Sequence, residues 1–366
     1  VQTCALPIYT HELIRSLNNT DSINDYLVFM PECDSLNNLN ENFRIQSVES
    51  VCSENFWENV KVPNILNSID IELYHIPQNG VGLSENIECK KVITLHDIIP
   101  LRMPETVSDR YLKIFNEELP KIIDLCDGII TVSEFSKTDI AKEFNFPLEK
   151  IFVTPLAAEK IYKPLSKCRS KTFITNKYGI EEDFILYVGG FSPRKNILGL
   201  IEAYSRLPSK LTDNFKLVIT GRKGPAYEMY KSRTEELKIA DKVIFTDFIP
   251  LQDMPLFYNA AEVLVYPSFY EGFGLPPIEA MACGTPVIAS NVTSLPEVCY
   301  ESALLIDPND IDLLSYDIER VLSNSLLKLT MVKKSLTRSN DFSWDKTATK
   351  TINAYKSIIE DASPNK

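Results

Sequence analysis

Histidine, closely spaced cysteine and positive charge are all scarce in this sequence, and each shortage argues against a class of function. The 366 residues include three histidines, and none of the eight cysteines stands in a C-x-x-C pair. A zinc site is therefore disfavoured, and the scattered cysteines fit a reducing, cytoplasmic compartment. The formal net charge of −12 argues against a nucleic-acid partner, whose phosphates require a basic surface.

Long hydrophobic runs and a dinucleotide fingerprint are missing as well. No apolar run reaches the roughly 18 residues of a membrane-spanning helix, although the chain could still rest on the inner face of a membrane. No G-x-G-x-x-G motif opens a helix, which weakens an interpretation as a nicotinamide-dependent oxidoreductase.

The first eight residues, VQTCALPI, differ in character from the rest of the chain. They carry no initiator Met, no basic segment and no strand pattern, so they do not read as a signal peptide. We expect residues 1–8 to be non-native, the native sequence to start near Tyr9, and an opening strand with its loop to be missing.

Strand-like and helix-like patterns alternate along the chain in two successive series. The first series has strand patterns over 26–30, 44–48, 71–75, 92–95, 128–132 and 151–154, and helical patterns over 9–17, 109–126 and 134–144. After a polar stretch reaching about residue 177, the second has strand patterns over 185–188, 216–220, 243–246, 263–266, 286–289 and 303–306, and helical patterns over 197–207, 227–239 and 311–322. Such alternation predicts parallel sheets covered by helices on both faces.

Two such series predict two domains. We expect an α/β fold with Rossmann-like, doubly wound domains over residues 1–165 and 166–341 that face one another across a cleft. An amphipathic final helix within residues 342–366 could pack locally or cross back to the first domain. Ligands of open parallel sheets bind outside the carboxyl ends of the strands, so the informative residues should lie there.

The stretch EGFGLPPIEAMACG, residues 271–284, lies at such a strand end and joins two carboxylates through glycine and proline. Its prolines suit the first turn of a helix, and Gly284 suits the position after that helix ends. Free amides at a helix start suit phosphate, and carboxylates accept paired hydrogen bonds from vicinal hydroxyls. The combination predicts a nucleotide-sugar site, although Glu279 alone could complement the helix dipole and Glu271 alone could be a solvated loop charge.

A second loop, GGFSPRKN over residues 189–196, follows the strand pattern at 185–188. Its two glycines allow close backbone approach, and Arg194 and Lys195 at a helix start suit a diphosphate. Adjacent cations before a helix are more often solvated, but these two should share a sheet edge with Glu271.

These stretches resemble the motifs of retaining GT-B glycosyltransferases of family 4. Residues 266–290, YPSFYEGFGLPPIEAMACGTPVIAS, resemble the family's Glu-x7-Glu signature, and residues 187–196, YVGGFSPRKN, resemble its phosphate loop. Residues 94–100, TLHDIIP, resemble the first-domain loop with a sugar-contacting histidine, and 131–136, TVSEFS, also fit. The resemblance covers nearly the whole chain, including residues 343–344, which resemble the segment that returns to the N-terminal domain.

The resemblance implies a role for each matched residue. Arg194 and Lys195 would hold the donor diphosphate, and Glu279 would bind the ribose hydroxyls. Glu271 and the loop amides after it would grip the transferred sugar. His96, which by itself would more often be structural, would contact that sugar from the acceptor side.

The implied residues form two overlapping sets. Donor binding would involve Gly189, Gly190, Arg194, Lys195, Glu271, Gly272, Phe273, Gly274, Leu275 and Glu279, and catalysis would involve His96, Glu271, Arg194 and Lys195. Retention would proceed by same-face attack without a covalent enzyme intermediate. No cofactor or metal is expected, because the cations neutralise the leaving group. Asp310 and Asp312 match a metal-binding D-x-D motif, but they begin a surface-type helix and are discounted.

Two departures from the family pattern affect what is expected. Many relatives carry an arginine where Gly190 stands, which leaves the phosphate role to Arg194. The absent opening loop would help to shape the acceptor side, so this chain could bind donor and still turn over poorly. The Pro-Arg-Lys-Asn loop favours GDP-mannose as donor.

The sequence therefore predicts a hexosyltransferase that uses a GDP- or UDP-sugar to extend a saccharide or lipid-linked glycan of a surface polysaccharide. Peripheral membrane contact stays open. One alternative is a catalytically silent subunit that binds sugar nucleotide, and another is an oxidoreductase on paired Rossmann domains.

Overall fold

The computed structural model describes residues 5–30, 36, 38–47, 60–224 and 226–361, and these form two compact units. The N-terminal unit contains residues 5–156 and 343–361, and the C-terminal unit contains residues 157–342. Within the described part of the chain, no helix combines the length and the apolar character that crossing a bilayer requires.

The expected non-native start lies partly outside the described residues, because residues 1–4 are not among them. Helix α1 (Ala5–Thr20) spans the helical pattern predicted from Tyr9 and extends it at both ends. That an opening strand and its loop are missing stays a prediction.

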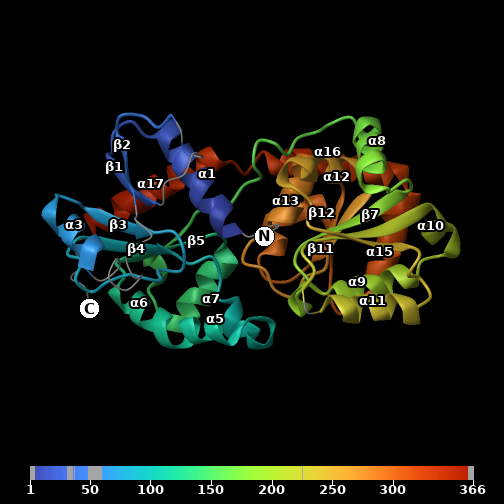
Figure 1. Cartoon of the computed structure of the whole chain (residues 1–366), viewed down its shortest axis with the longest axis horizontal. Coiled ribbons are helices and arrows are strands. Elements are labelled where there is room, and N and C mark those ends of the chain that lie inside the picture. The colour runs from blue at the N-terminus through green and yellow to red at the C-terminus, as the bar shows by residue number, and fades with distance from the viewer. Residues whose placement is uncertain (1–4, 31–35, 37, 48–59, 225, 362–366) are drawn as a thin grey trace. The chain divides into compact units, whose positions relative to one another are not determined.

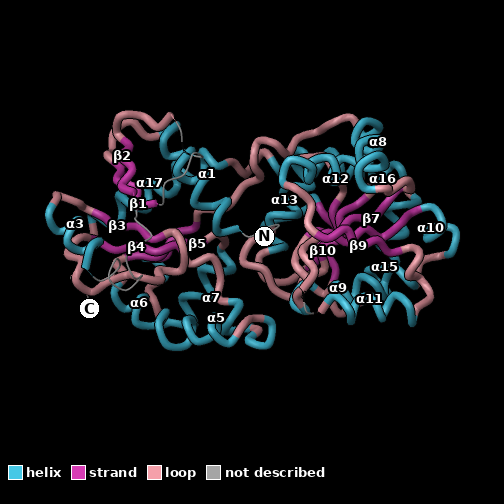
Figure 2. Tube along the Cα trace, in the orientation of Figure 1, coloured by secondary structure: helices cyan, strands magenta, loops and turns pink. Residues whose placement is uncertain are grey.

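The C-terminal unit is built on one parallel sheet, drawn in magenta in Figure 2. Its six strands lie in the order β12-β11-β10-β7-β8-β9. Its strands are β7 (Asp183–Val188), β8 (Phe215–Thr220), β9 (Val243–Asp247), β10 (Val263–Tyr266), β11 (Val287–Ser290) and β12 (Ala303–Ile306). All six coincide with predicted strand patterns to within two residues at each end. The central strands read as unbroken apolar runs because helices cover both of their faces.

Helices cover both faces of this sheet (Figure 1). One face carries α9 (Ile197–Ser205), α11 (Tyr227–Glu236) and α15 (Ile311–Ser323), and the other carries α8 (Lys167–Tyr178), α12 (Met254–Ala260), α13 (Leu275–Ala282) and α16 (Ser325–Ser339). Two shorter helices are α10 (Ser209–Asn214) and α14 (Leu295–Cys299). The unit is therefore doubly wound.

Helices α8 and α16 occupy stretches where the sequence predicts no element. The polar stretch before residue 177 is a helix because Ser166 accepts a hydrogen bond from the Arg169 amide at its start and Gly179 closes its end in the left-handed conformation. These are ordinary capping signals. The sequence pattern does not predict this helix because the segment has few apolar residues; only Ser170 and Ile174 are buried in it.

The N-terminal unit contains two parallel sheets among its described residues. Strands β3 (Leu73–Ile76), β4 (Lys90–Thr94), β5 (Gly128–Thr131) and β6 (Ile151–Val153) pair in that order, and β1 (Tyr26–Met30) pairs only with β2 (Phe43–Ser47). All six strands were predicted. Every side chain of β5 is buried, whereas those of β1 are all partly exposed, so the second pair lies at the periphery of the core.

The helices of this unit are α1, α3 (Val62–Ser68), α4 (Ile99–Arg102), α5 (Asp109–Lys113), α6 (Leu119–Leu125), α7 (Glu134–Phe144) and α17 (Trp344–Glu360). The single helix predicted over 109–126 is interrupted by a π-helical turn over Ile114–Glu118. Pro120 explains the interruption, because a proline inside a helix lacks the N–H that the preceding turn would bond.

The last helix packs on the N-terminal unit. Ala354 and Ile358 of α17 join Val92 and Ile130 in one buried cluster, and the Thr347 hydroxyl donates a hydrogen bond to the Pro155 carbonyl at 2.5 Å. Of the two alternatives that the sequence leaves open, local packing and return to the first domain, the structure shows the second.

Candidate active site

The sheet of the C-terminal unit changes direction between β7 and β10. From β7 the strand order runs through β8 to β9, and from β10 it runs the opposite way through β11 to β12. Connections diverge at such a point, which leaves a crevice outside the carboxyl ends of the two strands where ligands bind. The loop over 189–196 follows β7, and the loop over 267–274, which contains Glu271, follows β10, so both leave the sheet at this place.

The two loops are bonded to one another. The Phe269 amide donates a hydrogen bond to the Arg194 carbonyl at 2.9 Å, and the Arg194 guanidinium donates to the Tyr270 carbonyl. Asn196 adopts a left-handed conformation and accepts a hydrogen bond from the Gly199 amide, which starts α9. This turn directs the cations before it toward β10.

Arg194, Lys195 and Glu271 form a buried ion cluster. Nζ of Lys195 lies 2.7 Å from Oε1 of Glu271, and a guanidinium nitrogen of Arg194 lies 2.9 Å from the same oxygen. Because two cations share one carboxylate, the cluster keeps one net positive charge, and a dianionic or anionic ligand would complement it.

Two buried tyrosines hold Lys195 in place, and the sequence motif gave neither a role. Nζ of Lys195 donates to the Tyr266 hydroxyl at 2.5 Å and lies 4.9 Å from the centre of its ring. Tyr187 stacks on Tyr266 with ring centres 6.4 Å apart and donates to the Gly190 carbonyl. A Cβ at Gly189 would lie 2.7 Å from the Tyr187 hydroxyl. Tyr266 is the last residue of β10 and Tyr187 is the last but one of β7. A tyrosine close to the carboxyl end of an apolar strand is the signal that could have marked them.

Glu271 is ionised although it is buried. Burial alone raises the pKa of a carboxyl group, but the charges of Arg194 and Lys195 and the hydrogen bond from Lys195 outweigh it and lower the pKa of Glu271 to about 2. A carboxylate held by two cations is a weak base and a weak nucleophile.

The main chain around Glu271 is fixed by α14 and the turn before it. The Thr293 hydroxyl accepts a hydrogen bond from the Glu271 amide at 3.1 Å, and the Ser294 hydroxyl lies 2.9 Å from the Glu271 carbonyl and 2.8 Å from that of Phe273. No pattern around Thr293 or Ser294 identifies them from sequence, because their partners lie more than 20 residues away.

Gly274 caps α13 in a left-handed conformation with φ of 112°. Leu275 is the first residue of that helix, followed by two prolines as predicted. The helix start therefore leaves backbone amides available at the carboxyl end of β10. Phe273 is buried and packs edge to face on Phe342, which anchors the loop.

Glu279 sits in the second turn of α13 and is 3% exposed. Burial, with a contribution from Glu159, raises its pKa to about 7, although hydrogen bonds from Tyr258 and Tyr162 counteract this. The Tyr258 hydroxyl donates to Oε2 at 2.6 Å. Its carboxyl group is thus chemically different from that of Glu271, since no cation pairs with it among the described contacts.

Gly190 faces open space. A Cβ at this position would meet no atom within 4 Å, so this position could hold a larger side chain. The family pattern of arginine here is therefore not excluded by packing.

His96 lies in the N-terminal unit, just after β4. It is 7% exposed, and burial lowers its pKa to about 4, whereas the Pro77 carbonyl, which can only accept from the ring N–H, acts in the opposite direction. Its ring meets that of Tyr9 edge to face at 4.8 Å. His75, by contrast, uses both ring nitrogens, toward Tyr355 at 2.7 Å and Thr94 at 2.8 Å, so its role is structural.

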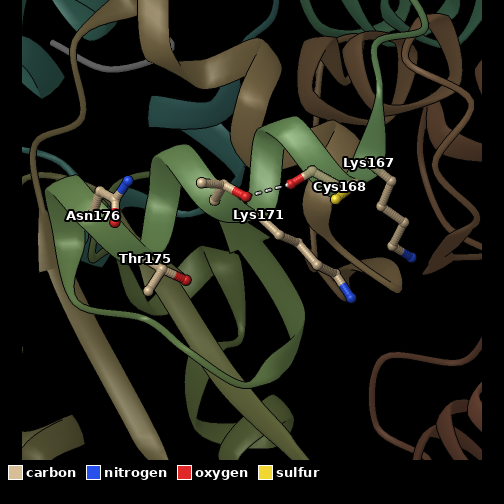
Figure 3. Close-up of a pocket in the computed structure, with 6 residues that line it drawn as sticks. Lys167, Cys168, Lys171, Thr175 and Asn176 are labelled. Carbon is tan, nitrogen blue, oxygen red and sulfur yellow. Dashed lines mark hydrogen bonds between the residues drawn. The ribbon is translucent and has the colours of Figure 1, made fainter.

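A separate pocket of about 560 Å³ lies along α8 (Figure 3). Its lysines, Lys167 and Lys171, extend to the same side of the helix, but they pair with Glu262 and Asp183. Each of these two lysines has a different carboxylate as its nearest partner, whereas Arg194 and Lys195 share Glu271. Nowhere in the described ranges do three His, Cys, Asp or Glu side chains group as a metal site requires. Asp310 instead caps α15.

A family model described as "Glycosyl transferases group 1" matches residues 170–337. O-antigen chain mannosyltransferase B of Escherichia coli is 37% identical over 78% of this chain and 74% of that protein. O-antigen chain mannosyltransferase RfbU of Salmonella typhimurium is 31% identical over 69% of this chain and 64% of that protein. Serotype-specific mannosyltransferase WbdA of Escherichia coli is 28% identical over 81% of this chain, which spans 37% of WbdA.

Two solved structures share the fold. Sucrose-phosphate synthase from Thermosynechococcus elongatus superposes with a TM-score of 0.74 and 22% identity, covering 96% of this chain and 92% of that one. Anabaena Alr3699/HepE in complex with UDP and glucose gives a TM-score of 0.73 and 16% identity, covering 96% and 95%.

Proposed function

Because this chain belongs to the group 1 glycosyltransferases, we propose that it transfers a mannosyl residue from GDP-mannose, with retention, to a saccharide or lipid-linked glycan. It is a glycosyltransferase, and its α/β fold is that of the GT-B enzymes, as predicted. Two relatives are named as O-antigen chain mannosyltransferases, which supports mannose as the sugar and surface polysaccharide as the product.

The observation that carries the donor assignment is the ion cluster at the end of β7 and β10. Its net positive charge, at the sheet's change of direction, suits the diphosphate of a nucleotide sugar. Arg194 and Lys195 bind that diphosphate and stabilise the negative charge that develops on the leaving nucleoside diphosphate. Gly189 and Gly190 let the backbone approach it.

The two glutamates take different parts of the donor. Glu279 binds the ribose hydroxyls, and Glu271 positions the transferred sugar together with the backbone amides of Gly272 to Leu275. His96 contacts that sugar as a neutral imidazole, since burial keeps its pKa near 4.

Retention follows from attack on the same face as the departing diphosphate, without a covalent intermediate. The ion pairs of Glu271 support this, because a carboxylate already held by two cations is a poor nucleophile. Positioning and leaving-group stabilisation then account for the rate. No cofactor or metal ion is part of the proposal.

A donor screen tests the proposal. The chain is incubated with GDP-mannose, UDP-glucose and GDP-glucose, each radiolabelled in the sugar, with a mannose-ended oligosaccharide as acceptor. We expect transfer from GDP-mannose in preference to the others, and NMR of the product should show the donor's anomeric configuration.

Preference for a UDP-sugar would overturn the choice of donor, and an inverted product would overturn retention. Binding of GDP-mannose with neither transfer nor hydrolysis would instead favour the silent binding subunit.

A further inference from the structure

Glu279 has two carboxylate oxygens, and one of them is already engaged within the C-terminal unit. We propose that Tyr258 is a positioning residue that fixes Oε2 of Glu279 and so presents Oε1 to the vicinal hydroxyls of the donor nucleoside. This inference rests on the proposed function, because it takes Glu279 to be a donor-binding residue.

The contact joins two rigid helices. Tyr258 in α12 is 0% exposed, Glu279 in α13 is 3% exposed, and the hydroxyl lies 2.6 Å from Oε2. The Thr285 hydroxyl donates to the Tyr258 carbonyl at 2.6 Å, which fixes the end of α12. Neither side chain loses much further freedom when a ligand arrives, and binding is stronger where the site is preorganised.

The connecting segment 157–165 packs against Tyr258. The ring of Tyr162 meets that of Tyr258 edge to face at 5.6 Å. The Asn259 side chain donates to the Lys163 carbonyl at 3.0 Å and accepts from the Leu165 amide at 2.6 Å. The Tyr258 ring is therefore held against Glu279 by packing as well as by its own hydrogen bond.

Charge explains why the hydrogen bond matters to ligand binding. A carboxyl group accepts hydrogen bonds from two adjacent hydroxyls more strongly in its ionised form, because both oxygens are then acceptors and the bonds are charge-assisted. The groups that face Glu279 are Tyr258 from α12, Tyr162 and Glu159 from the connecting segment, and Cys283, which follows α13. Burial and Glu159 favour the protonated form, whereas the two tyrosines favour the ionised one. Removing the Tyr258 hydroxyl therefore shifts Glu279 toward its protonated form, which binds the hydroxyls more weakly.

The test is Tyr258→Phe, which keeps the ring and removes the hydroxyl. At pH 7 we expect KM for GDP-mannose to rise about 10-fold, in line with loss of a charge-assisted hydrogen bond, while kcat stays within about 2-fold. The acid limb of the kcat/KM profile, where Glu279 becomes protonated, should move to higher pH. A variant that matches the wild type in both KM and pH profile overturns the inference.

Tyr204→Phe is the matched control. Tyr204 is also 0% exposed in the same unit, and its hydroxyl donates to the Phe215 carbonyl at 2.8 Å, away from both glutamates. Loss of that bond should lower the melting temperature and leave KM and the pH profile unchanged. If both variants raise KM equally, Tyr258 acts only through stability and the inference fails.

Glu279→Gln separates this inference from the proposed function. If Glu279→Gln leaves KM for GDP-mannose unchanged, Glu279 is not a donor-binding residue and its assigned role fails. If it raises KM while Tyr258→Phe does not, only the positioning role of Tyr258 fails. In the Glu279→Gln background Tyr258→Phe should add less than about 2-fold, because coupled residues are not additive.

Discussion

At the scale of single residues, the site depends on how burial and charge act on two glutamates of one helix-loop segment. Glu271 is buried beside Arg194 and Lys195, which keep it ionised and hold it in a fixed place. Glu279 is buried beside hydroxyl groups and another carboxyl group, which leave its pKa at about 7. A glutamate is therefore suited to lasting ion pairs at position 271 and to binding hydroxyl groups at position 279.

Lys195→Ala tests the diphosphate assignment. Removing a charge-assisted contact should weaken GDP binding by about 1.5–3 kcal/mol, measured by isothermal titration calorimetry at neutral pH. Lys171→Ala, which breaks ion pairs on α8, is the control and should leave GDP affinity unchanged. A loss within experimental error for Lys195→Ala would remove this lysine from the donor site.

Glu271→Gln should change the acid dependence of stability. The pKa of Glu271 falls from 4.5 to about 2 on folding, so its ionised form stabilises the fold above pH 4.5, and this contribution is lost as the pH falls toward 2. The contribution is on the order of 3 kcal/mol. Urea unfolding should show the variant less stable at pH 7, with the two free energies of unfolding converging toward pH 2. A constant difference across that range would contradict the assignment.

At the scale of elements, α13 begins where it does because Gly274 can adopt a conformation that other residues resist. Its φ of 112° turns the chain from the loop after β10 into the helix, and two prolines follow in the first turn. The backbone amides of the loop and the position of Glu279 both depend on this turn. The function of the segment is thus set by its backbone as much as by its carboxylates.

Gly274→Ala should destabilise the fold by about 1–3 kcal/mol, because alanine is strained at this φ. Its Cβ would also lie 2.7 Å from Cδ2 of Leu295. Gly190→Ala is the matched control in the facing loop, since its Cβ meets nothing within 4 Å, and it should be neutral. Thermal unfolding of both variants decides the point, and equal melting temperatures would show that α13 does not need glycine here.

At the scale of the whole molecule, the chain passes from the N-terminal unit to the C-terminal unit and then returns. Helix α17 follows the last helix of the C-terminal unit in sequence but packs with α1 and against β5 and β6. Gly128 in β5 allows this close packing, because a Cβ there would lie 2.7 Å from Cδ1 of Ile358. The stability of the N-terminal unit therefore depends on residues more than 180 positions after its main segment ends.

Gly128→Ala should lower the free energy of unfolding by about 1–3 kcal/mol through overpacking. Ile358→Ala removes the obstructing atoms, so in that background Gly128→Ala should have little further effect. The measurement is a double-mutant cycle by urea unfolding. Equal effects in the two backgrounds would mean that α17 does not press on β5 at this residue.

Much of the architecture could be predicted from local patterns. All twelve described strands were expected from short β-rich runs. The buried strands, such as β5 and β10, are largely apolar because strands covered on both faces leave little room for polar residues. The α13 segment was expected from its prolines and from Gly284, which are local stop and start signals. Helices α8 and α16 were not predicted, because their exposed faces make the sequence pattern polar. The π turn at 114–118 was not predicted either, because it depends on the effect of Pro120 on the preceding turn.

The sequence by itself determined the fold class, the glycosyltransferase family and the two loops that carry charge. Hydrophobic periodicity, the glycines and prolines that start and end elements, and short sequence motifs are all local properties of the chain. Only the tertiary structure decided that Glu271 meets Arg194 and Lys195, that Tyr258 holds Glu279, and that α17 returns to the first unit. Those contacts join residues from 21 positions apart, for Tyr258 and Glu279, to more than 320 positions apart, for α1 and α17. They form because β7 and β10 are neighbours in the sheet and because residues far apart in the sequence pack together in the core. A local sequence pattern contains no information about such pairings.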